Sequence, residues 1–169
     1  MMSRDRVAVE QRKTKETEII ASVNLDGEGR SEIKTGIGFF DHMLEQIARH
    51  GNIDLELSVK GDLHIDTHHS IEDTGIALGK AFAKAVGNKK GISRFSSALV
   101  PLDETLVRAV VDISGRPYLY TDLPFTRETV GEFPSEMVVE FMRAFSYNAG
   151  ITLHLEILHG DNCYHQIEA

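Results

Sequence analysis

Apolar and polar residues alternate most clearly in two segments of the chain, residues 52–60 and 151–158. A period of two places alternate side chains on one face, as expected of a half-buried strand. A Gly-Asp pair follows closely after each segment. The alternating apolar positions are Ile53, Leu55, Leu57 and Val59 in the first segment and Ile151, Leu153, Leu155 and Ile157 in the second. The pattern predicts two related strands in two related parts of the chain.

Apolar positions at helical spacing predict three helices of ordinary length. We expect Asp41 and Ser135 to cap the first and third helices, because short polar side chains accept the free N–H groups at a helix start. Gly87 and Gly150 suit the ends of the second and third. The expected limits are Asp41 to about His50, Thr67 or His68 to Gly87, and Ser135 to about Asn148.

Shorter runs rich in β-formers predict the remaining strands. Residues 17–25 and 31–35 flank the turn Asp26-Gly27-Glu28-Gly29, so we expect these two strands to pair as a hairpin. Residues 6–11 alternate weakly, and the second half has strand patterns at 95–100, 106–113 and 118–123. Each half then reads strand, strand, strand, helix, strand, helix. We predict an α+β fold of two similar halves, residues 1–90 and 91–169, forming one compact domain.

The composition is that of an ordinary globular protein, and it excludes several classes of function. A net charge of −8 argues against a nucleic-acid partner. A single cysteine, Cys163, leaves no internal disulfide and fits a reducing compartment, so we expect a cytoplasmic protein. No apolar run is long enough to span a membrane, so no membrane partner is expected.

A short pattern, x-His-x-Ile-Glu-x, occurs twice, each time after Gly-Asp. The copies are His68-His69-Ser70-Ile71-Glu72-Asp73 and Tyr164-His165-Gln166-Ile167-Glu168-Ala169. In a helix, positions four apart share a face, so His68 and Glu72 can bind one ion. His69 is rotated by roughly 100° and must point elsewhere.

The second copy repeats this arrangement, with position 164 and Glu168 on one side and His165 on the other. Imidazole with carboxylate suits zinc, manganese, iron or nickel. A solvated helix start is the competing interpretation of one copy, but the repetition favours metal. The first copy opens a helix with about five inward apolar side chains, each contributing about 1.5–3 kcal/mol. The second copy ends the chain, so we expect the second half to lack its last helix, either by truncation or with another subunit covering the gap.

The other candidate residues are ambiguous from spacing alone. His42 and Glu140 lie near the starts of equivalent helices, and Arg94 and Arg116 lie at strand or turn boundaries where they could bind a phosphate. Glu16 could act as an acid or base, but it lies in a charged run. Taken singly, each is more often a structural or surface residue, as we also expect of His50.

Seven runs resemble the imidazoleglycerol-phosphate dehydratase family of histidine biosynthesis, in order and over nearly the whole chain. The runs are Arg12 to Thr17, Thr35 to Leu44, Gly61 to Leu63, His68 to Asp73, Pro101 to Glu104, Asp112 to Pro117 and Ile151 to His154. The resemblance implies two halves, each a four-stranded sheet with helices on one face. It also implies a homo-oligomer of twenty-four subunits, with active sites between subunits and two manganese ions per subunit.

The resemblance also implies the role of each site residue. The metal ligands would be His42, His69, Tyr164 and Glu168 for one ion, and His68, Glu72, Glu140 and His165 for the other. The catalytic residues would be Glu16, His42, Glu72 and Glu168, with Glu16 moving a proton. The substrate-binding residues would be Glu16, His42, His50, His68, Arg94 and Arg116, with the arginines on the phosphate, helped by a basic C-terminal loop. The small-molecule phosphate imidazole glycerol phosphate would lose water to give imidazole acetol phosphate.

The chain departs from the family pattern in three places. Tyr164 stands where histidine is usual, and phenol binds manganese poorly unless it is ionised. Glu140 also replaces histidine in many members, but a carboxylate is a competent ligand. The chain ends at Ala169, before the last helix and the basic loop. Two alternatives therefore remain: a catalytically impaired homologue that keeps the scaffold and part of the metal site, and a two-metal hydrolase.

Overall fold

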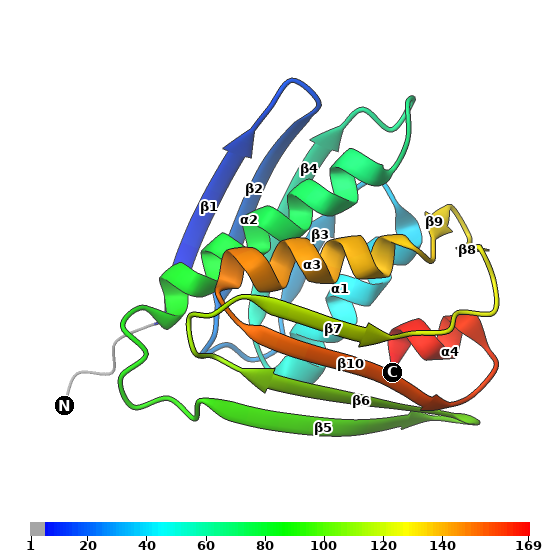
Figure 1. The fold of residues 1–169 in the computed structure, drawn as a ribbon. Helices are drawn as coiled ribbons and strands as arrows, with labels where there is room; N and C mark the ends of the chain where they lie inside the picture. The colour runs from blue at the N-terminus through cyan, green and yellow to red at the C-terminus, as the bar shows by residue number, and fades with distance from the viewer. Residues whose placement is uncertain (1–5) are drawn as a thin grey trace.

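Two four-stranded sheets form the framework of the computed structural model, which describes residues 6–169 (Figure 1). Residues 1–5 of the predicted first half lie outside the described part. The first half comprises β1 (Val7–Lys13), β2 (Thr17–Asn24), β3 (Ser31–Lys34), α1 (Gly38–Gly51), β4 (Asp54–Gly61) and α2 (His68–Val86). The second comprises β5 (Phe95–Leu102), β6 (Thr105–Asp112), β7 (Tyr118–Asp122), β8 (Thr129–Val130), β9 (Phe133–Pro134), α3 (Met137–Ala149), β10 (Thr152–His159) and α4 (Cys163–Glu168).

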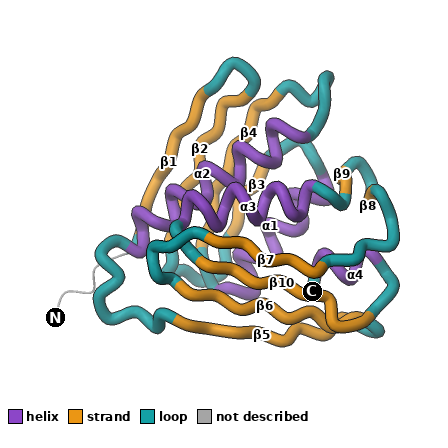
Figure 2. The backbone as a smooth tube through the Cα atoms, viewed as in Figure 1, coloured by secondary structure: helices purple, strands orange, loops and turns teal. Residues whose placement is uncertain are grey.

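The two sheets have the same topology. Their strand orders are β1-β2-β4-β3 and β5-β6-β10-β7, so each strand of the first sheet has a counterpart in the second. Figure 2 shows the two groups of strands with helices packed between them. The predicted α+β fold of two similar halves, each a four-stranded sheet with helices on one face, is confirmed.

The predicted hairpin between residues 17–25 and 31–35 is wrong. β3 instead pairs in parallel with β4, with Ile33 opposite Leu57. The reason is that β2 lies between β1 and β4, and both of its edges are already paired. The turn at residues 26–29 is fixed from outside, because Asp54 Oδ1 accepts hydrogen bonds from the N–H groups of Glu28 (2.9 Å) and Arg30 (3.0 Å).

The predicted ends of α2 and α3 at Gly87 and Gly150 are confirmed, but neither predicted N-terminal cap forms. α1 begins at Gly38, so Asp41 lies in its first turn and accepts hydrogen bonds from the backbone N–H of Thr35 (2.9 Å) and from its hydroxyl (2.5 Å). α3 begins at Met137, and the Ser135 hydroxyl donates to the carbonyl of Arg127 at 2.7 Å. Both side chains thus fix the loop before the helix. The short β8–β9 hairpin was not predicted, because two-residue strands show no periodicity.

The helices α2 and α3 lie side by side between the sheets and join the two halves (Figure 1). Gly75 and Gly79 make this close approach possible. A Cβ at Gly75 would lie 2.8 Å from the Phe141 carbonyl oxygen, and one at Gly79 would lie 2.6 Å from that of Phe145. The main buried cluster accordingly contains apolar side chains from both halves, including Leu44, Ile71 and Phe141.

The last helix, α4, has six residues, whereas its counterpart α2 has nineteen. The second half therefore does have a last helix, but only the six residues Cys163–Glu168 form it. Asn162 caps α4, since its side-chain oxygen accepts from the N–H groups of Tyr164 (3.0 Å) and His165 (3.4 Å). An apolar groove of about 330 Å³ lies beside α4, between Ile47 of α1 and the sheet of the second half. No helix in residues 6–169 is long and apolar enough to cross a membrane.

Candidate metal and active site

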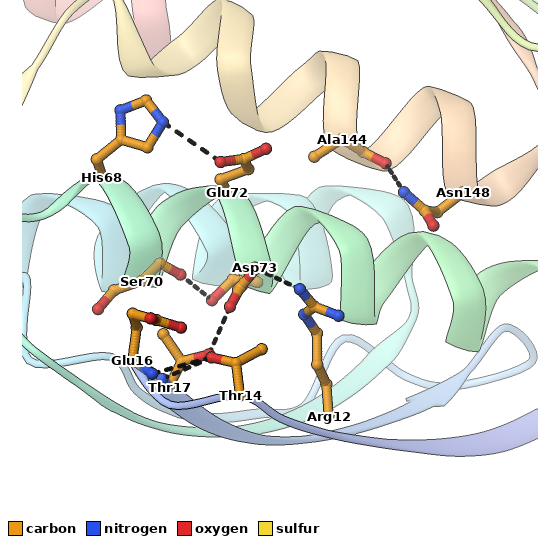
Figure 3. Close-up of polar contacts among 11 residues, drawn as sticks. Arg12, Thr14, Glu16, Thr17, His68, Ser70, Glu72, Asp73, Ala144 and Asn148 are labelled. Carbon is orange, nitrogen blue, oxygen red and sulfur yellow. Dashed lines mark hydrogen bonds and ion pairs between the residues drawn. The ribbon is translucent and has the colours of Figure 1, made fainter.

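The first turn of α2 brings His68 and Glu72 together. His68 Nε2 lies 3.3 Å from Glu72 Oε2 across one helical turn (Figure 3). Both side chains are nearly half exposed, at 47% and 43%. The four-residue spacing places them on one face, as the sequence pattern predicts. Their donor atoms are free to face a common ligand.

A second pair joins the two halves of the chain. His42 on α1 lies with its Nε2 atom 3.6 Å from Oε1 of Glu168 on α4. Tyr164 is beside them, with its ring centroid 6.2 Å from that of His42 and 5.2 Å from that of Phe39. Burial, and then the charge of Glu168, raises the pKa of the Tyr164 phenol. The phenol is therefore un-ionised at neutral pH.

Both pairs have the geometry of neighbouring ligands on one cation. Two bonds of about 2.1 Å at right angles place their donor atoms about 3 Å apart. The separations of 3.3 Å and 3.6 Å are close to this value. Within residues 6–169, however, no group of three or more His, Cys, Asp or Glu side chains could hold a metal. Each pair therefore offers two donor atoms from one chain.

The histidine at the second position of each motif, His69 or His165, is hydrogen-bonded to a carboxylate outside these pairs. His69 Nδ1 lies 2.9 Å from Asp62 Oδ2, and His165 Nδ1 lies 2.8 Å from Glu104 Oε2. The hydrogen bond that His69 donates to Asp62 raises the pKa of His69, and the same bond lowers the pKa of Asp62. The bond that Glu104 accepts from His165, followed by that from the Asn162 N–H, lowers the pKa of Glu104 to about 2.

His50 and Glu140 make local contacts on their own helices. His50 Nε2 lies 3.1 Å from Gln46 Oε1, and Gln46 Nε2 lies 3.3 Å from His42 Nδ1, so a hydrogen-bonded row runs along α1 from His50 to His42. Glu140 accepts a hydrogen bond from Arg143 Nη1 at 2.6 Å in the first turns of α3. Glu140 is only part-exposed, on the helix that packs against α2.

Glu16 lies in the turn between β1 and β2, close to the first turn of α2 (Figure 3). Its backbone is fixed by the Thr14 hydroxyl, which accepts from the Glu16 N–H at 3.1 Å. Asp73 of α2 anchors the same turn, accepting from Arg12 Nη2 at 2.8 Å and from the Thr17 hydroxyl at 2.5 Å. Among residues 6–169, no hydrogen-bond or ion-pair partner contacts the exposed Glu16 carboxylate.

Three residues of the candidate site were not identified from the sequence: Asp62, Asp73 and Glu104. Asp62 is the aspartate of the Gly-Asp pair before the first motif, and Asp73 follows Glu72 directly. Their positions beside the repeated motif could have identified both residues. Glu104 lies in a run that resembles the family, but its contact with His165 could not be predicted, because the two residues are distant in the sequence and the contact depends on the β5–β6 turn reaching α4.

Arg94 and Arg116 meet at one end of the second sheet, around Asp112. Arg94 binds both oxygens of Asp112, with its Nε at 2.6 Å and its Nη2 at 3.0 Å. Arg116 Nη2 lies 3.7 Å from the same carboxylate, and its side chain is 73% exposed. Two guanidinium groups that share one carboxylate leave net positive charge for an anion such as phosphate.

In one chain this arginine pair lies far from the second motif. Asp112 ends β6, whereas Glu104, the partner of His165, immediately precedes the first residue of β6. At about 3.4 Å per residue, the eight-residue strand separates the two ends by about 24 Å. A small substrate therefore cannot contact Arg116 and His165 of the same chain at once.

Comparison with known proteins identifies the family of the chain. Residues 35–169 match the imidazoleglycerol-phosphate dehydratase family. An imidazoleglycerol-phosphate dehydratase of Thermoanaerobacter pseudethanolicus is 60% identical over 164 residues, which cover 97% of this chain and 84% of the relative. That of Methylibium petroleiphilum is 55% identical over 168 residues, covering 99% of this chain and 84% of the relative.

Two solved structures have the same fold. The Staphylococcus aureus imidazoleglycerol-phosphate dehydratase superposes with a TM-score of 0.87 at 39% identity, covering 96% of this chain and 90% of that one. The Pyrococcus furiosus enzyme gives a TM-score of 0.82 at 34% identity, covering 94% and 85%. The chain therefore belongs to the imidazoleglycerol-phosphate dehydratase family, a family of hydro-lyases in histidine biosynthesis.

Proposed function

We propose that this protein removes water from imidazole glycerol phosphate, giving imidazole acetol phosphate, in metal sites that several copies of the chain complete together. The proposal rests on one observation. The chain has two incomplete His–carboxylate sets, and it also has an arginine pair that lies at the far end of the second sheet from the second motif. His42 with Glu168 and His68 with Glu72 supply two donors each. A second copy must provide the missing ligands, because one chain holds no larger group among residues 6–169.

The two ligand sets follow from the clusters and the resemblance. His42 and Glu168, with Tyr164 beside them, would be completed by His69 of another copy. His68 and Glu72, with Glu140 on the neighbouring helix, would be completed by His165 of another copy. Imidazole and carboxylate donors suit manganese. The proposed assembly is a homo-oligomer, as large as the twenty-four subunits that the resemblance implies.

The chain's own residues carry the chemical steps. Arg94 and Arg116 bind the phosphate and so fix one end of the substrate. Glu16, whose carboxylate has no competing partner in residues 6–169, accepts the proton from the glycerol carbon. The C–O bond breaks, and the hydroxyl takes up one proton and leaves as water, which balances the proton that Glu16 removed from carbon. The resulting enol then relaxes to the ketone. A bound divalent cation supplies Lewis-acid stabilisation of the negative charge that develops on the imidazole ring.

One observation favours a second candidate, a catalytically impaired homologue that keeps the scaffold. The pKa of the Tyr164 phenol is raised, so this position offers a weak ligand where the other positions offer imidazole or carboxylate. A homologue of this kind would bind cations weakly and turn over slowly. No comparable feature favours the two-metal hydrolase.

The shared site is tested by mixing two impaired variants and assaying them at a substrate concentration well below the KM of wild type, where a raised KM lowers the rate. Arg116→Ala and His165→Ala each remove one part of the site, and the two parts lie at opposite ends of β6. Co-assembled from equal amounts of each chain, they should recover activity up to about a quarter of wild type, because some sites then draw an intact part from each chain. The readout is formation of the ketone product with Mn²⁺ present.

The matched control mixes Arg116→Ala with Arg94→Ala. Both arginines lie around the same Asp112, so every site of that mixture lacks one of them, and no recovery is expected. Absence of recovery in the first mixture, with co-assembly shown by mass spectrometry, would contradict a site shared between copies. Recovery in both mixtures would contradict the assignment of the arginines to one anion site.

A further inference from the structure

The two halves carry a glutamate at the same place in the turn between their first two strands. Glu16 immediately precedes Thr17, the first residue of β2, and Glu104 immediately precedes Thr105, the first residue of β6. β2 and β6 occupy the same place in their sheets. The two carboxylates are therefore counterparts, yet their surroundings differ.

The difference lies in which carboxylate binds the motif histidine. In the second half the turn residue itself does so, with Glu104 Oε2 at 2.8 Å from His165 Nδ1. In the first half the loop before α2 supplies Asp62 instead, whose Oδ2 lies 2.9 Å from His69 Nδ1. Because His69 Nδ1 is hydrogen-bonded to Asp62, the carboxylate of Glu16 has no hydrogen-bond or ion-pair partner among residues 6–169.

We propose that Asp62 and Glu104 are positioning residues, which hold His69 and His165 with the proton on Nδ1 and the Nε2 lone pair free to bind a cation. The proposal rests on the proposed metal-dependent function. It also explains how one of two counterpart carboxylates becomes available for proton transfer while the other orients a ligand.

The physical reason is the hydrogen-bonding capacity of the groups. A neutral imidazole has one N–H donor and one lone-pair acceptor, whereas an ionised carboxylate only accepts. A carboxylate at Nδ1 therefore requires the proton to be on Nδ1, and Nε2 is then available as a ligand. Both contacts are to Nδ1, so both histidines are held in the same tautomer.

Glu104 allows a decisive test, because its second oxygen already accepts two hydrogen bonds. Its Oε1 accepts from the Asn162 N–H at 2.9 Å and from the Thr105 hydroxyl at 2.9 Å. The backbone N–H can only donate. In Glu104→Gln the amide oxygen must stay on Asn162, and the amide NH₂ then faces His165 Nδ1. This change keeps the contact with the cap of α4 but reverses the tautomer.

The corresponding amide substitution of Asp62 should disturb the tautomer of its histidine less. Its Oδ1 is buried and has no hydrogen-bond partner in the described chain. In Asp62→Asn the amide can therefore rotate so that its oxygen still accepts from His69 Nδ1, although a neutral acceptor is weaker than a carboxylate. Asp62→Ala removes the acceptor altogether.

Two measurements test the proposal. In metal-free protein with ¹⁵N-labelled histidine, spectra at about pH 9, well above the ordinary histidine pKa, should show the proton on Nδ1 of His69 and His165. Glu104→Gln should move it to Nε2 of His165. Electron paramagnetic resonance of free Mn²⁺ should show about 10–100-fold weaker binding by Glu104→Gln and Asp62→Ala, and about threefold weaker binding by Asp62→Asn.

The matched control is Glu156→Gln, which neutralises a carboxylate that binds Arg108 on β6. Its Mn²⁺ affinity should equal that of wild type. The proposal is overturned by a proton on Nε2 of His165 in the wild-type protein, or by wild-type Mn²⁺ affinity in Glu104→Gln, which a purely structural role of Glu104 predicts. Wild-type protein that binds no Mn²⁺ would overturn the proposed function instead, and the spectra of the metal-free protein would still decide the tautomer.

Discussion

His42 Nε2 lies 3.6 Å from Glu168 Oε1, so the first helix of one half meets the last helix of the other. The second pair of helices, α2 and α3, also joins opposite halves. In the internal repeat, α1 corresponds to α3 and α2 corresponds to α4. The α1–α4 contact is therefore equivalent to the α2–α3 contact. The two candidate half-sites, one around Glu168 and the other around Glu72, therefore arise from one duplicated arrangement.

Tyr164 should limit cation binding at the half-site around Glu168. Burial keeps its phenol un-ionised, so we expect Tyr164→His to raise Mn²⁺ affinity by about tenfold or more, because imidazole is a good ligand for this ion. Tyr164→Phe should change the affinity by less than about twofold, since a neutral phenol contributes little and the ring contact with Phe39 remains. Titration of free Mn²⁺ measures both. A tenfold loss in Tyr164→Phe would instead identify the phenolate as a ligand.

The contact between α2 and α3 should be intolerant of any added side chain at Gly79. A Cβ there would lie 2.6 Å from the Phe145 carbonyl oxygen and 2.9 Å from Asn148 Cβ, so Gly79→Ala must move the two helices apart. We expect a loss of about 1–3 kcal/mol in the free energy of unfolding, measured with urea. Gly38→Ala is the control, because a Cβ at Gly38 has no neighbour within 4 Å. Equal stability of the two variants would contradict the tight packing.

The sequence predicted the parts of the fold and site that depend on local periodicity. The alternation around Leu57 and Leu155 located β4 and β10, and the four-residue spacing of His68 and Glu72 placed both on one face of α2. The pairing of β3 could not be predicted in this way, because the partner of a strand is set by which sheet edges remain free. The contact between His42 and Glu168 likewise depends on packing between helices from opposite halves.

Asp54 should stabilise the protein in a pH-dependent way. Hydrogen bonds from the N–H groups of Glu28 and then Arg30 lower its pKa from the ordinary value of 3.8. A lowered pKa in the folded state gives stability that is present above about pH 4 and is lost as the pH falls through the folded value. Asp54→Ala should therefore reduce stability most at neutral pH, and the difference from wild type should shrink below about pH 4.

Urea unfolding at several pH values measures this difference, with Glu56→Ala as the control. Glu56 is an exposed residue of the same strand, and no hydrogen bond to its carboxylate is present in residues 6–169. The Glu56→Ala curve should run parallel to that of wild type. A constant gap between Asp54→Ala and wild type down to about pH 2 would show that the turn gains nothing from the carboxylate charge.

The arginine pair should control the KM of the phosphorylated substrate. Arg116 is 73% exposed and only 3.7 Å from Asp112, so Arg116→Ala should raise KM with little effect on kcat or stability. Loss of one charged hydrogen bond, about 1.5–3 kcal/mol, corresponds to about a 10–100-fold change. Arg94→Ala should raise KM further, because it also removes both hydrogen bonds to Asp112 and leaves that carboxylate beside the phosphate with only the 3.7 Å contact to Arg116. Adding Asp112→Ala to Arg94→Ala should then recover part of the loss, since the repulsive charge is gone. Steady-state kinetics with Mn²⁺ measure each variant, and an unchanged KM in Arg116→Ala would rule out phosphate binding at this end of the sheet.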